Sequence, residues 1–356
     1  GSGSTRGKKQ LSSENKKCKE KITMKKKLLA LVLACAMALG LAACGGSKAE
    51  TPAGNNGDAA NGNDAAKTYL VGICQLAPHP ALDAATQGFK DALTEALGER
   101  VRFEEQNAAG ESNTCSTIVN GFVSENVDLI LANASSALQA AASATGDIPV
   151  LGTAVTEYGV ALNIPDFNGT VGTNVSGTSD LAPLDQQAAM IPEWCPDAKT
   201  VGLLYCSAEA NSQYQVDTVQ AALEALGLTC TQYPFSDTND MASVTQTAAD
   251  NSDVLYVPTD NTIANNTGIV DNICHGKIPV FAGEEGVCSG CGVATLSISY
   301  YDLGVTTGQM AVKILTGESN VAEMPIEYAP QFTKKYNPAA CEALGLTVPE
   351  GYEAIA

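Results

Sequence analysis

The chain has 356 residues, 45% of them hydrophobic, and a formal net charge of −19. Such a chain can bury the cores of two domains, which excludes a disordered polypeptide. The chain has 20 basic and 39 acidic residues. Residues 1–43 contain ten of the basic and two of the acidic residues. The remaining 10 basic and 37 acidic residues give the rest of the chain a charge of −27. This acidity argues against nucleic acid or another polyanion as partner.

Residues 24–43 are typical of a lipoprotein signal peptide. A basic stretch after Met24 precedes an Ala-rich apolar run that is too short for a confident membrane span. The run ends in Leu-Ala-Ala-Cys44, which resembles a bacterial lipobox, in which the Cys is lipidated and becomes the mature first residue. A secreted protein cleaved without a lipidated Cys is the alternative. Residues 1–23 fit neither a signal nor a fold, and we interpret them as an upstream, non-native extension.

Residues 44–67 are rich in Gly, Asn, Ala and Asp and have no apolar periodicity, which predicts a flexible tether. Together with the lipid on Cys44, the tether would hold a folded body at the extracytoplasmic face of the cell membrane.

From Thr68 onward, short apolar runs alternate with helical patterns. Continuous apolar strands that alternate with helices predict a parallel sheet covered on both faces. The expected strands are 69–75, 100–106, 127–133 and 148–155, and the expected helices are 82–98, 114–126 and 135–145.

The pattern then repeats, with Val71 and Ile148 answered by Val201 and Ile278 at an offset of 130 positions. The repeat predicts an α/β fold of two similar Rossmann-like lobes, with parallel sheets joined by a multi-crossover hinge. The predicted N-terminal lobe comprises residues 68–180 plus about 287–320, and the predicted C-terminal lobe 181–286 plus about 321–356.

Two facing parallel sheets place the carboxyl ends of their strands around one cleft, where such sheets bind ligands. The polar or aromatic residues at these ends are therefore the candidate ligand-binding residues. They are Gln75, His79, Ser135, Ser136, Thr153, Thr156, Asp180, Asn211, Asp260, Asn261, Glu284 and Tyr300.

Several stretches resemble the substrate-binding lipoproteins of ABC transporters, in the group of tryptophan/tyrosine-type binding proteins. They are "HPALDAATQGF", "TNVSGTSDLAPLDQQ", "LYCSAEANS", "VPTDNTIA", "IPVFAGEEG" and "ISYYDLGVTTGQMAVKIL". The resemblance covers nearly all of residues 68–350. It implies the type I periplasmic-binding-protein fold, a monomer, an aromatic or apolar amino acid as ligand, and a permease and an ATPase as partners.

An α-amino acid needs a site for its carboxylate and one for its ammonium group. The helix that begins at Ser135 and Ser136 offers free N–H groups and hydroxyls for the carboxylate, although Ser135 is equally suited to cap its own helix. Asp180 and Asp260 are the best-placed ammonium partners, with Glu284 third, although an Asp at a strand end is also a common cap.

The remaining candidates would orient the ligand or form the wall of its side-chain pocket. The amides of Asn211 and Asn261 both donate and accept and are suited to orienting a ligand, whereas Tyr300 and His79 would wall a side-chain pocket. Asp83, in the first turn of the next helix, suits the helix dipole.

The sequence favours a binding protein over an enzyme, with no cofactor and no metal. The body has only His79 and His275 to activate a nucleophile, and it lacks GxSxG, GxGxxG and P-loop spacings. Nine cysteines follow Cys44, and their scattered placement suggests buried thiols. The CSGC motif at 288–291 is the exception, with a metal half-site, a redox pair, a local disulfide or free thiols as alternatives.

Three other functions remain open from the sequence. A nucleoside or sugar receptor would commonly stack its ligand on Trp, but Trp194 is expected away from the cleft. A sensing lipoprotein for a membrane signalling partner would use the same closure of the two lobes. A metal or redox protein would rest on the CSGC motif.

Overall fold

The computed structural model describes residues 67–355. The signal peptide, Cys44, the extension 1–23 and the tether up to residue 66 lie outside the described residues. The described residues form one compact unit with its own hydrophobic cores. Within 67–355, no helix is both long and apolar enough to cross a bilayer.

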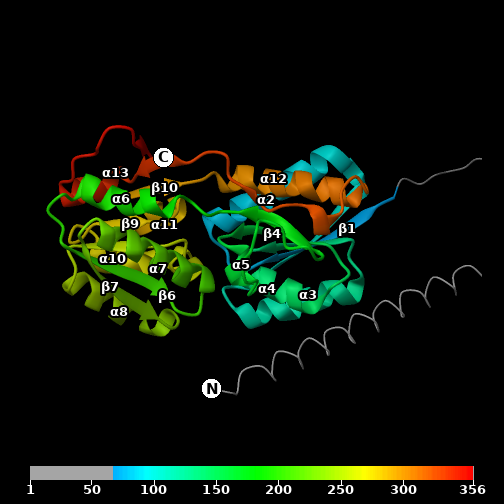
Figure 1. Cartoon of the computed structure of the whole chain (residues 1–356), viewed down its shortest axis with the longest axis horizontal. Helices are drawn as coiled ribbons and strands as arrows, with labels where there is room; N and C mark the ends of the chain where they lie inside the picture. Colours follow the sequence, from blue (N-terminus) through cyan, green and yellow to red (C-terminus); the bar gives the residue numbers. More distant parts are fainter. Residues whose placement is uncertain (1–66, 356) are drawn as a thin grey trace, which may run out of the picture. The chain divides into compact units, whose positions relative to one another are not determined.

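The N-terminal lobe is built on a six-stranded parallel sheet with the order β11-β5-β4-β3-β1-β2. Its strands are β1 (Tyr69–Gln75), β2 (Val101–Asn107), β3 (Leu129–Asn133), β4 (Val150–Val155), β5 (Val175–Ser179) and β11 (Glu327–Tyr328). Its helices are α2 (Pro80–Leu97), η1 (Gly98–Arg100), α3 (Ser112–Glu125), α4 (Ser135–Ala144), α5 (Tyr158–Ala161), α12 (Tyr300–Leu315) and η2 (Val321–Glu323). Helices α2 and α12 cover one face of the sheet, and α3 and α4 cover the other (Figure 1).

The C-terminal lobe is built on a seven-stranded sheet with the order β13-β12-β10-β9-β8-β6-β7. Its strands are β6 (Thr200–Cys206), β7 (Thr229–Phe235), β8 (Val254–Val257), β9 (Val280–Ala282), β10 (Ala294–Ser297), β12 (Thr333–Tyr336) and β13 (Glu353–Ala354). Only the β10–β12 pair is antiparallel. Its helices are α6 (Leu184–Trp194), α7 (Ala210–Ala225), α8 (Thr238–Asp250), α9 (Asn261–Ala264), α10 (Thr267–Cys274), α11 (Glu285–Cys291) and α13 (Pro338–Leu344).

The chain passes between the two sheets after β5, after β10 and after β11, so the hinge has three crossovers. The predicted fold class, two parallel-sheet lobes joined by a multi-crossover hinge, is confirmed. The predicted boundaries at residues 287 and 321 differ from the sheet membership, because β10 pairs with β9 and β11 pairs with β5. The run from β10 into α12 has only Ile298 and Ser299 between its elements, so no break in the pattern marks the crossover there.

Helices α2 and α12 pack closely because glycines lie at their contact. A Cβ atom at Gly88 would overlap the carbonyl oxygen of Tyr301, and one at Gly304 would overlap the carbonyl oxygen of Ala85. The first residues of both helices border the cleft, so this packing fixes one wall of it.

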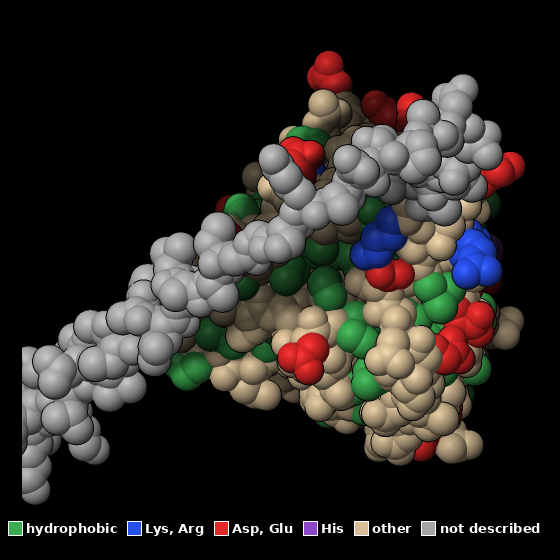
Figure 2. All heavy atoms as spheres, turned by 90° about the vertical axis from the view of Figure 1, so that its right-hand side faces the viewer, with side chains coloured by type: hydrophobic (Ala, Val, Ile, Leu, Met, Phe, Trp, Pro, Cys, Tyr) green, Lys and Arg blue, Asp and Glu red, His purple; other side chains and the backbone are tan. Residues whose placement is uncertain are grey.

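Acidic side chains are scattered over the face shown in Figure 2, with basic ones among them, and do not gather into one patch. This distribution fits a solubilising surface charge better than a binding site for a cationic partner.

Candidate functional site

The carboxyl ends of the strands enclose a small cavity between the lobes, called here the central cavity. Eight of the twelve predicted residues line it: His79, Thr156, Asp180, Asn211, Asp260, Asn261, Glu284 and Tyr300. Ala81, Leu82, Ala154, Thr259 and Ala264 complete its wall. Its volume of about 10 Å³ leaves room for roughly one water molecule, so the lobes must part for a larger ligand to enter.

The other four predicted residues do not line the central cavity. Gln75 uses its side chain within the lobe, donating to the Asp83 carboxylate over 2.6 Å and accepting from Thr86 over 2.6 Å. Thr153 lies beneath α12, where its hydroxyl receives a hydrogen bond from Thr307 over 3.1 Å. Side chains at and near the end of a parallel strand alternate between the two faces of the sheet, and the sequence alone did not show which of them turn toward the cleft.

Ser135 and Ser136 begin α4, as predicted, but they do not face the same space as Asp180. Ser136 lines a separate groove of about 370 Å³ that also includes Glu209, called here the outer groove. The predicted carboxylate site at α4 is therefore not in the cavity that holds the predicted ammonium partners.

Asp180 is buried, and one of its two carboxylate oxygens accepts no hydrogen bond from the described residues. It follows β5 in the first crossover and is 7% exposed. Its Oδ2 atom accepts from the Tyr300 hydroxyl over 2.9 Å, whereas its Oδ1 atom has no hydrogen-bond partner among residues 67–355. Burial raises the pKa of this carboxyl, and the hydroxyl groups of Tyr300 and Thr156 oppose the rise. A cationic ligand group beside Oδ1 would remove this penalty.

Asp260 and Glu284 cap helices and have their oxygens occupied. Asp260 Oδ1 accepts from the Ile263 N–H over 2.9 Å, and Oδ2 accepts from the Cys206 N–H over 2.7 Å and from the Ser212 hydroxyl over 2.8 Å. Glu284 accepts from the N–H groups that open α11, each over 2.6 Å. Burial raises the pKa of both carboxyls to about 7. The capping alternative therefore holds for these two acids.

A chain of hydrogen bonds joins the lobes through His79. Its Nε2 atom lies 3.2 Å from Oδ1 of Asn261, whose Nδ2 atom donates to Oε2 of Glu209 over 2.7 Å. A second contact between the lobes runs from Gln215 Nε2 to the Thr156 hydroxyl over 3.3 Å. These contacts hold the two walls of the cavity together.

Sequence reasoning missed Glu209, Gln215 and Thr259. Glu209 accepts from the backbone and side chain of Asn261 and Thr262, and so fixes the start of α9. The repeat carried a signal for it, because an offset of 130 places it opposite His79. Gln215 accepts from Thr259 over 2.5 Å from inside α7, and no pattern marked either residue.

A larger hollow, the lateral groove, adjoins the central cavity. It has a volume of about 640 Å³ and shares four wall residues with the central cavity: Ala81, Ala264, Glu284 and Tyr300. Its wall includes both apolar side chains and the ion pair of Lys335 with Glu285, which spans 2.6 Å.

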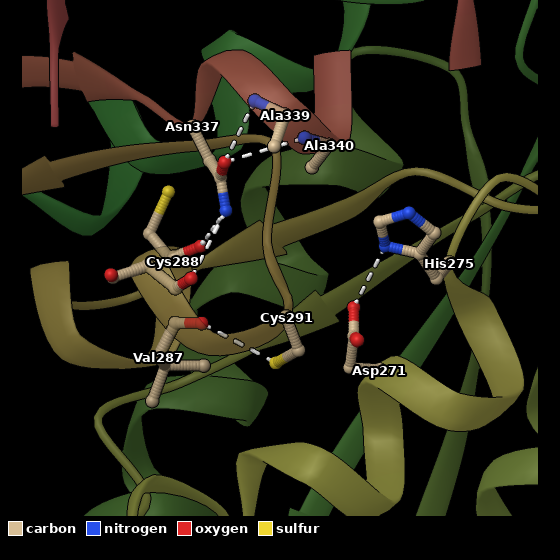
Figure 3. A network of polar contacts seen from close by, with 9 residues as sticks. Asp271, His275, Val287, Cys288, Cys291, Asn337, Ala339 and Ala340 are labelled. Atoms are coloured by element: carbon tan, nitrogen blue, oxygen red, sulfur yellow. Dashed lines mark hydrogen bonds and ion pairs between the residues drawn. The ribbon is translucent and has the colours of Figure 1, made fainter. Parts of the chain in front are cut away.

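The CSGC motif forms the second half of α11, where Ser289 and Gly290 line the lateral groove but no residue of the motif lines the central cavity. Cys288 and Cys291 are buried and carry free thiols, and Cys291 donates to the carbonyl of Val287 over 3.3 Å (Figure 3). Asn337 donates to the Cys288 carbonyl over 3.2 Å, which ties α11 to the start of α13. His275 is the C-cap residue of α10, and its Nδ1 atom lies 3.0 Å from Oδ1 of Asp271. Within the described residues, no group of three or more His, Cys, Asp or Glu is arranged to hold a metal ion.

Trp194 is buried in the core of the C-terminal lobe, with its ring centroid 5.0 Å from that of Tyr352 in an edge-on arrangement. It lines none of the three hollows at the cleft. The expectation that Trp194 lies away from the cleft is confirmed.

The fold and the cleft define a two-lobe solute-binding protein. Residues 70–356 match the model of a family described as "ABC transporter substrate binding protein". A tyrosine-binding protein of Clostridioides difficile (strain R20291) is 33% identical over 306 residues, which cover 85% of this chain and 87% of the relative. The chain therefore belongs to the ABC transporter substrate-binding protein family. It is a binding protein of an ABC importer and not an enzyme, as the sequence predicted.

Two solved structures show how the lobes are arranged. An ABC domain from Streptococcus pneumonia in complex with L-Trp has a TM-score of 0.77 and 32% identity, covering 81% of this chain and all of that one. The ligand-free, open form of a substrate-binding protein with adhesive properties from Clostridium difficile has a TM-score of 0.63 and 36% identity, covering 81% and 99%. At similar identity, this chain superposes better on the liganded relative than on the open one. This difference agrees with the small volume of the central cavity.

Proposed function

We propose that the central cavity binds an aromatic α-amino acid, with its ammonium group at Asp180. The observation that carries the proposal is the buried Oδ1 atom of Asp180, a carboxylate oxygen without a partner among the described residues on a cavity shared by both lobes. Asp180 is preferred to Asp260 and Glu284 because the oxygens of those two acids already accept from backbone N–H groups. The named ligands of the two relatives, tyrosine and L-Trp, support this class of ligand.

The wall of the cavity suits a ligand with an apolar side chain. Ala81, Leu82, Ala154 and Ala264 offer short or apolar side chains, and Tyr300 adds an aromatic ring where the central cavity adjoins the lateral groove. When the lobes part, a ligand's ring would extend toward the lateral groove, whose volume of about 640 Å³ exceeds the need of an indole ring. Thr156, Asn211 and Asn261 would orient its polar atoms.

Thermal unfolding of the chain from Asp64 onward, with each of the twenty amino acids in turn, tests the ligand class. Binding to the folded state alone raises the unfolding temperature by mass action. We expect the largest shifts with L-tryptophan and L-tyrosine and little shift with acidic amino acids. An absence of any shift would contradict the ligand class and leave the family membership untouched.

We further propose that Cys44 is lipidated, that the body is held at the extracytoplasmic face of the membrane through residues 44–67, and that it works as a monomer with a permease and an ATPase. The lipobox-like sequence supports the anchor, and the family supports the partners. Cys44→Ser should abolish incorporation of a labelled fatty acid and release the protein from the membrane fraction. Label that persists in this variant would contradict the anchor.

A further inference from the structure

The first turn of α2 has N–H groups that lack partners within the lobe. This helix has 18 residues and begins at Pro80, with His79 as an N-cap that makes no side-chain capping bond. The Asp83 N–H donates to the His79 carbonyl over 3.0 Å, but among residues 67–355 no acceptor meets the N–H of Ala81 or Leu82. Both residues are buried, at 6% and 2% exposure, and both line the central cavity. Buried helix N–H groups without an acceptor are rare, because each loses its hydration without compensation.

His79 is a second group beside this helix end that lacks a partner. It is 6% exposed and lines the same cavity, and its Nδ1 atom has no hydrogen-bond partner in the described part of the chain. The other ring nitrogen, Nε2, already contacts Asn261. Because Nδ2 of Asn261 donates to the Glu209 carboxylate, Oδ1 of Asn261 must accept, so Nε2 of His79 carries a proton. The Nδ1 atom is thus left for a ligand.

The cavity needs such a site if it binds a zwitterion. Among the described residues that line it, none is Lys or Arg, and three are carboxylic acids: Asp180, Asp260 and Glu284. Among the described residues of the wall, positive potential therefore comes from helix N-termini, and from His79 when its ring is protonated. The N-termini of α9 and α11 are already capped by the carboxylates of Asp260 and Glu284. Helix α7, whose Asn211 also lines the cavity, has the acidic Glu209 at its N-cap position, whereas α2 has no carboxylate at its N-cap.

We propose that the N-terminus of α2, through the N–H groups of Ala81 and Leu82 together with Nδ1 of His79, binds the carboxylate of the ligand. The inference rests on the proposed function, since it supplies the anion site for an amino acid whose ammonium group lies at Asp180. It replaces the helix end at Ser135, which does not face the central cavity. A helix N-terminus binds a carboxylate through its free N–H groups and its dipole.

This geometry determines which protonation state of the His79 ring can bind a carboxylate. Since Nε2 already carries a proton, Nδ1 donates to a carboxylate only when the ring is protonated. Burial lowers the pKa of His79, while Asn261, Glu209 and Asp83 oppose that shift. A bound carboxylate would raise the lowered pKa of His79, so its contribution to affinity is complete below the pKa of the free protein and is lost as pH rises through the pKa of the complex.

The test compares amino acids with the amines that lack only the carboxylate. Affinities of L-tryptophan and tryptamine, and of L-tyrosine and tyramine, are measured by calorimetry with the chain from Asp64 onward. Asp180, Asp260 and Glu284 affect both members of a pair, so the ratio of the two dissociation constants isolates the carboxylate. In the wild-type protein we expect a ratio of about 10 to 100 in favour of the amino acid, decreasing as pH rises and the His79 ring loses its second proton.

In His79→Leu, which keeps a side chain of similar size without nitrogen atoms, the ratio should fall at least tenfold and lose its pH dependence. His79→Gln, which keeps an N–H donor, should retain part of the ratio. Ser136→Ala, at the helix end in the outer groove, should leave the ratio unchanged. Unfolding temperatures of all variants check that they are folded, and loss of the contact with Asn261 lowers both affinities equally.

A ratio that persists in His79→Leu, or that falls in Ser136→Ala instead, would overturn the carboxylate site while the proposed function stands. Equal binding of amine and amino acid by the wild-type protein would do the same. Failure of the wild-type protein to bind any amino acid would overturn the proposed function and this inference with it.

Discussion

Replacing Asp180 with Asn tests the assignment of the ammonium partner most directly. The variant removes the charge but keeps the shape of the side chain, and its amide oxygen still accepts from the Tyr300 hydroxyl, which in the wild-type protein lies 2.9 Å from Oδ2. The unpaired Oδ1 position becomes an uncharged NH₂ group. A hydrogen bond between charged groups contributes about 1.5–3 kcal/mol, so affinity for the amino acid should fall about 10- to 100-fold.

The same substitution should stabilise the protein without ligand. Burial raises the pKa of Asp180, so the folded state favours the protonated acid, and keeping the carboxylate costs stability at neutral pH. The folded state binds a proton that the unfolded state has released, and stability therefore falls as pH rises from the unfolded pKa through the folded one. Asp180→Asn removes this loss, and we expect a gain on the order of 1 kcal/mol at pH 7 that disappears in acid.

Calorimetric titration with L-tryptophan and urea unfolding at pH 4 and pH 7 measure the two effects. Asp302→Asn is the matched control, since Asp302 lies in the first turn of α12, is exposed and does not line the cavity. It should change neither affinity nor the pH dependence of stability. Unchanged affinity in Asp180→Asn would refute the ammonium site, and a loss of affinity together with a loss of stability would indicate a structural role instead.

The remaining predictions concern the fold around the site. Asp260→Asn should lower the free energy of unfolding by about 1–3 kcal/mol, because three donors lose a carboxylate acceptor; an unchanged urea midpoint would contradict its capping role. Since the pKa values of Asp260 and Glu284 are raised to about 7, the unfolding temperature should fall from pH 5 to pH 7 and then level off, and calorimetry that shows a rise would refute this. Gly304→Ala should destabilise the protein by about 1–3 kcal/mol by pushing α12 off α2, whereas Gly121→Ala, with open space around the new methyl group, should not.

The sequence predicted where the site lies better than what each residue does there. The alternation of strands and helices placed His79, Asp180, Asp260 and Glu284 at strand ends, and all four line one cavity. Their roles depend on which way each side chain turns, and that is decided by neighbours far away in the chain. Cys206, for example, donates to Asp260 across 54 positions, and no local pattern marks that bond.

The same limit explains the residues that were placed wrongly or missed. Gln75 ends β1 like a cleft residue, but Asp83 and Thr86 on the next helix engage both ends of its amide. Gln215 lies inside α7, where helical spacing predicts only a buried position, yet it reaches Thr156 of the other lobe. Contacts that form only when two lobes close have no signature in either lobe's own periodicity.

The buried titratable side chains of the central cavity are of two kinds, those that cap helices and those that keep an atom without a partner. Asp260 and Glu284 exchange hydration for backbone N–H donors and so stabilise the starts of α9 and α11. Asp180 and His79 each keep one atom without a partner among the described residues, which costs stability unless a ligand supplies the missing bond. Since both atoms belong to residues that line the central cavity, a zwitterion that pairs with both would gain most from closure. Closure and binding are then linked, because closure removes both atoms from water and the ligand supplies the bonds that replace their hydration.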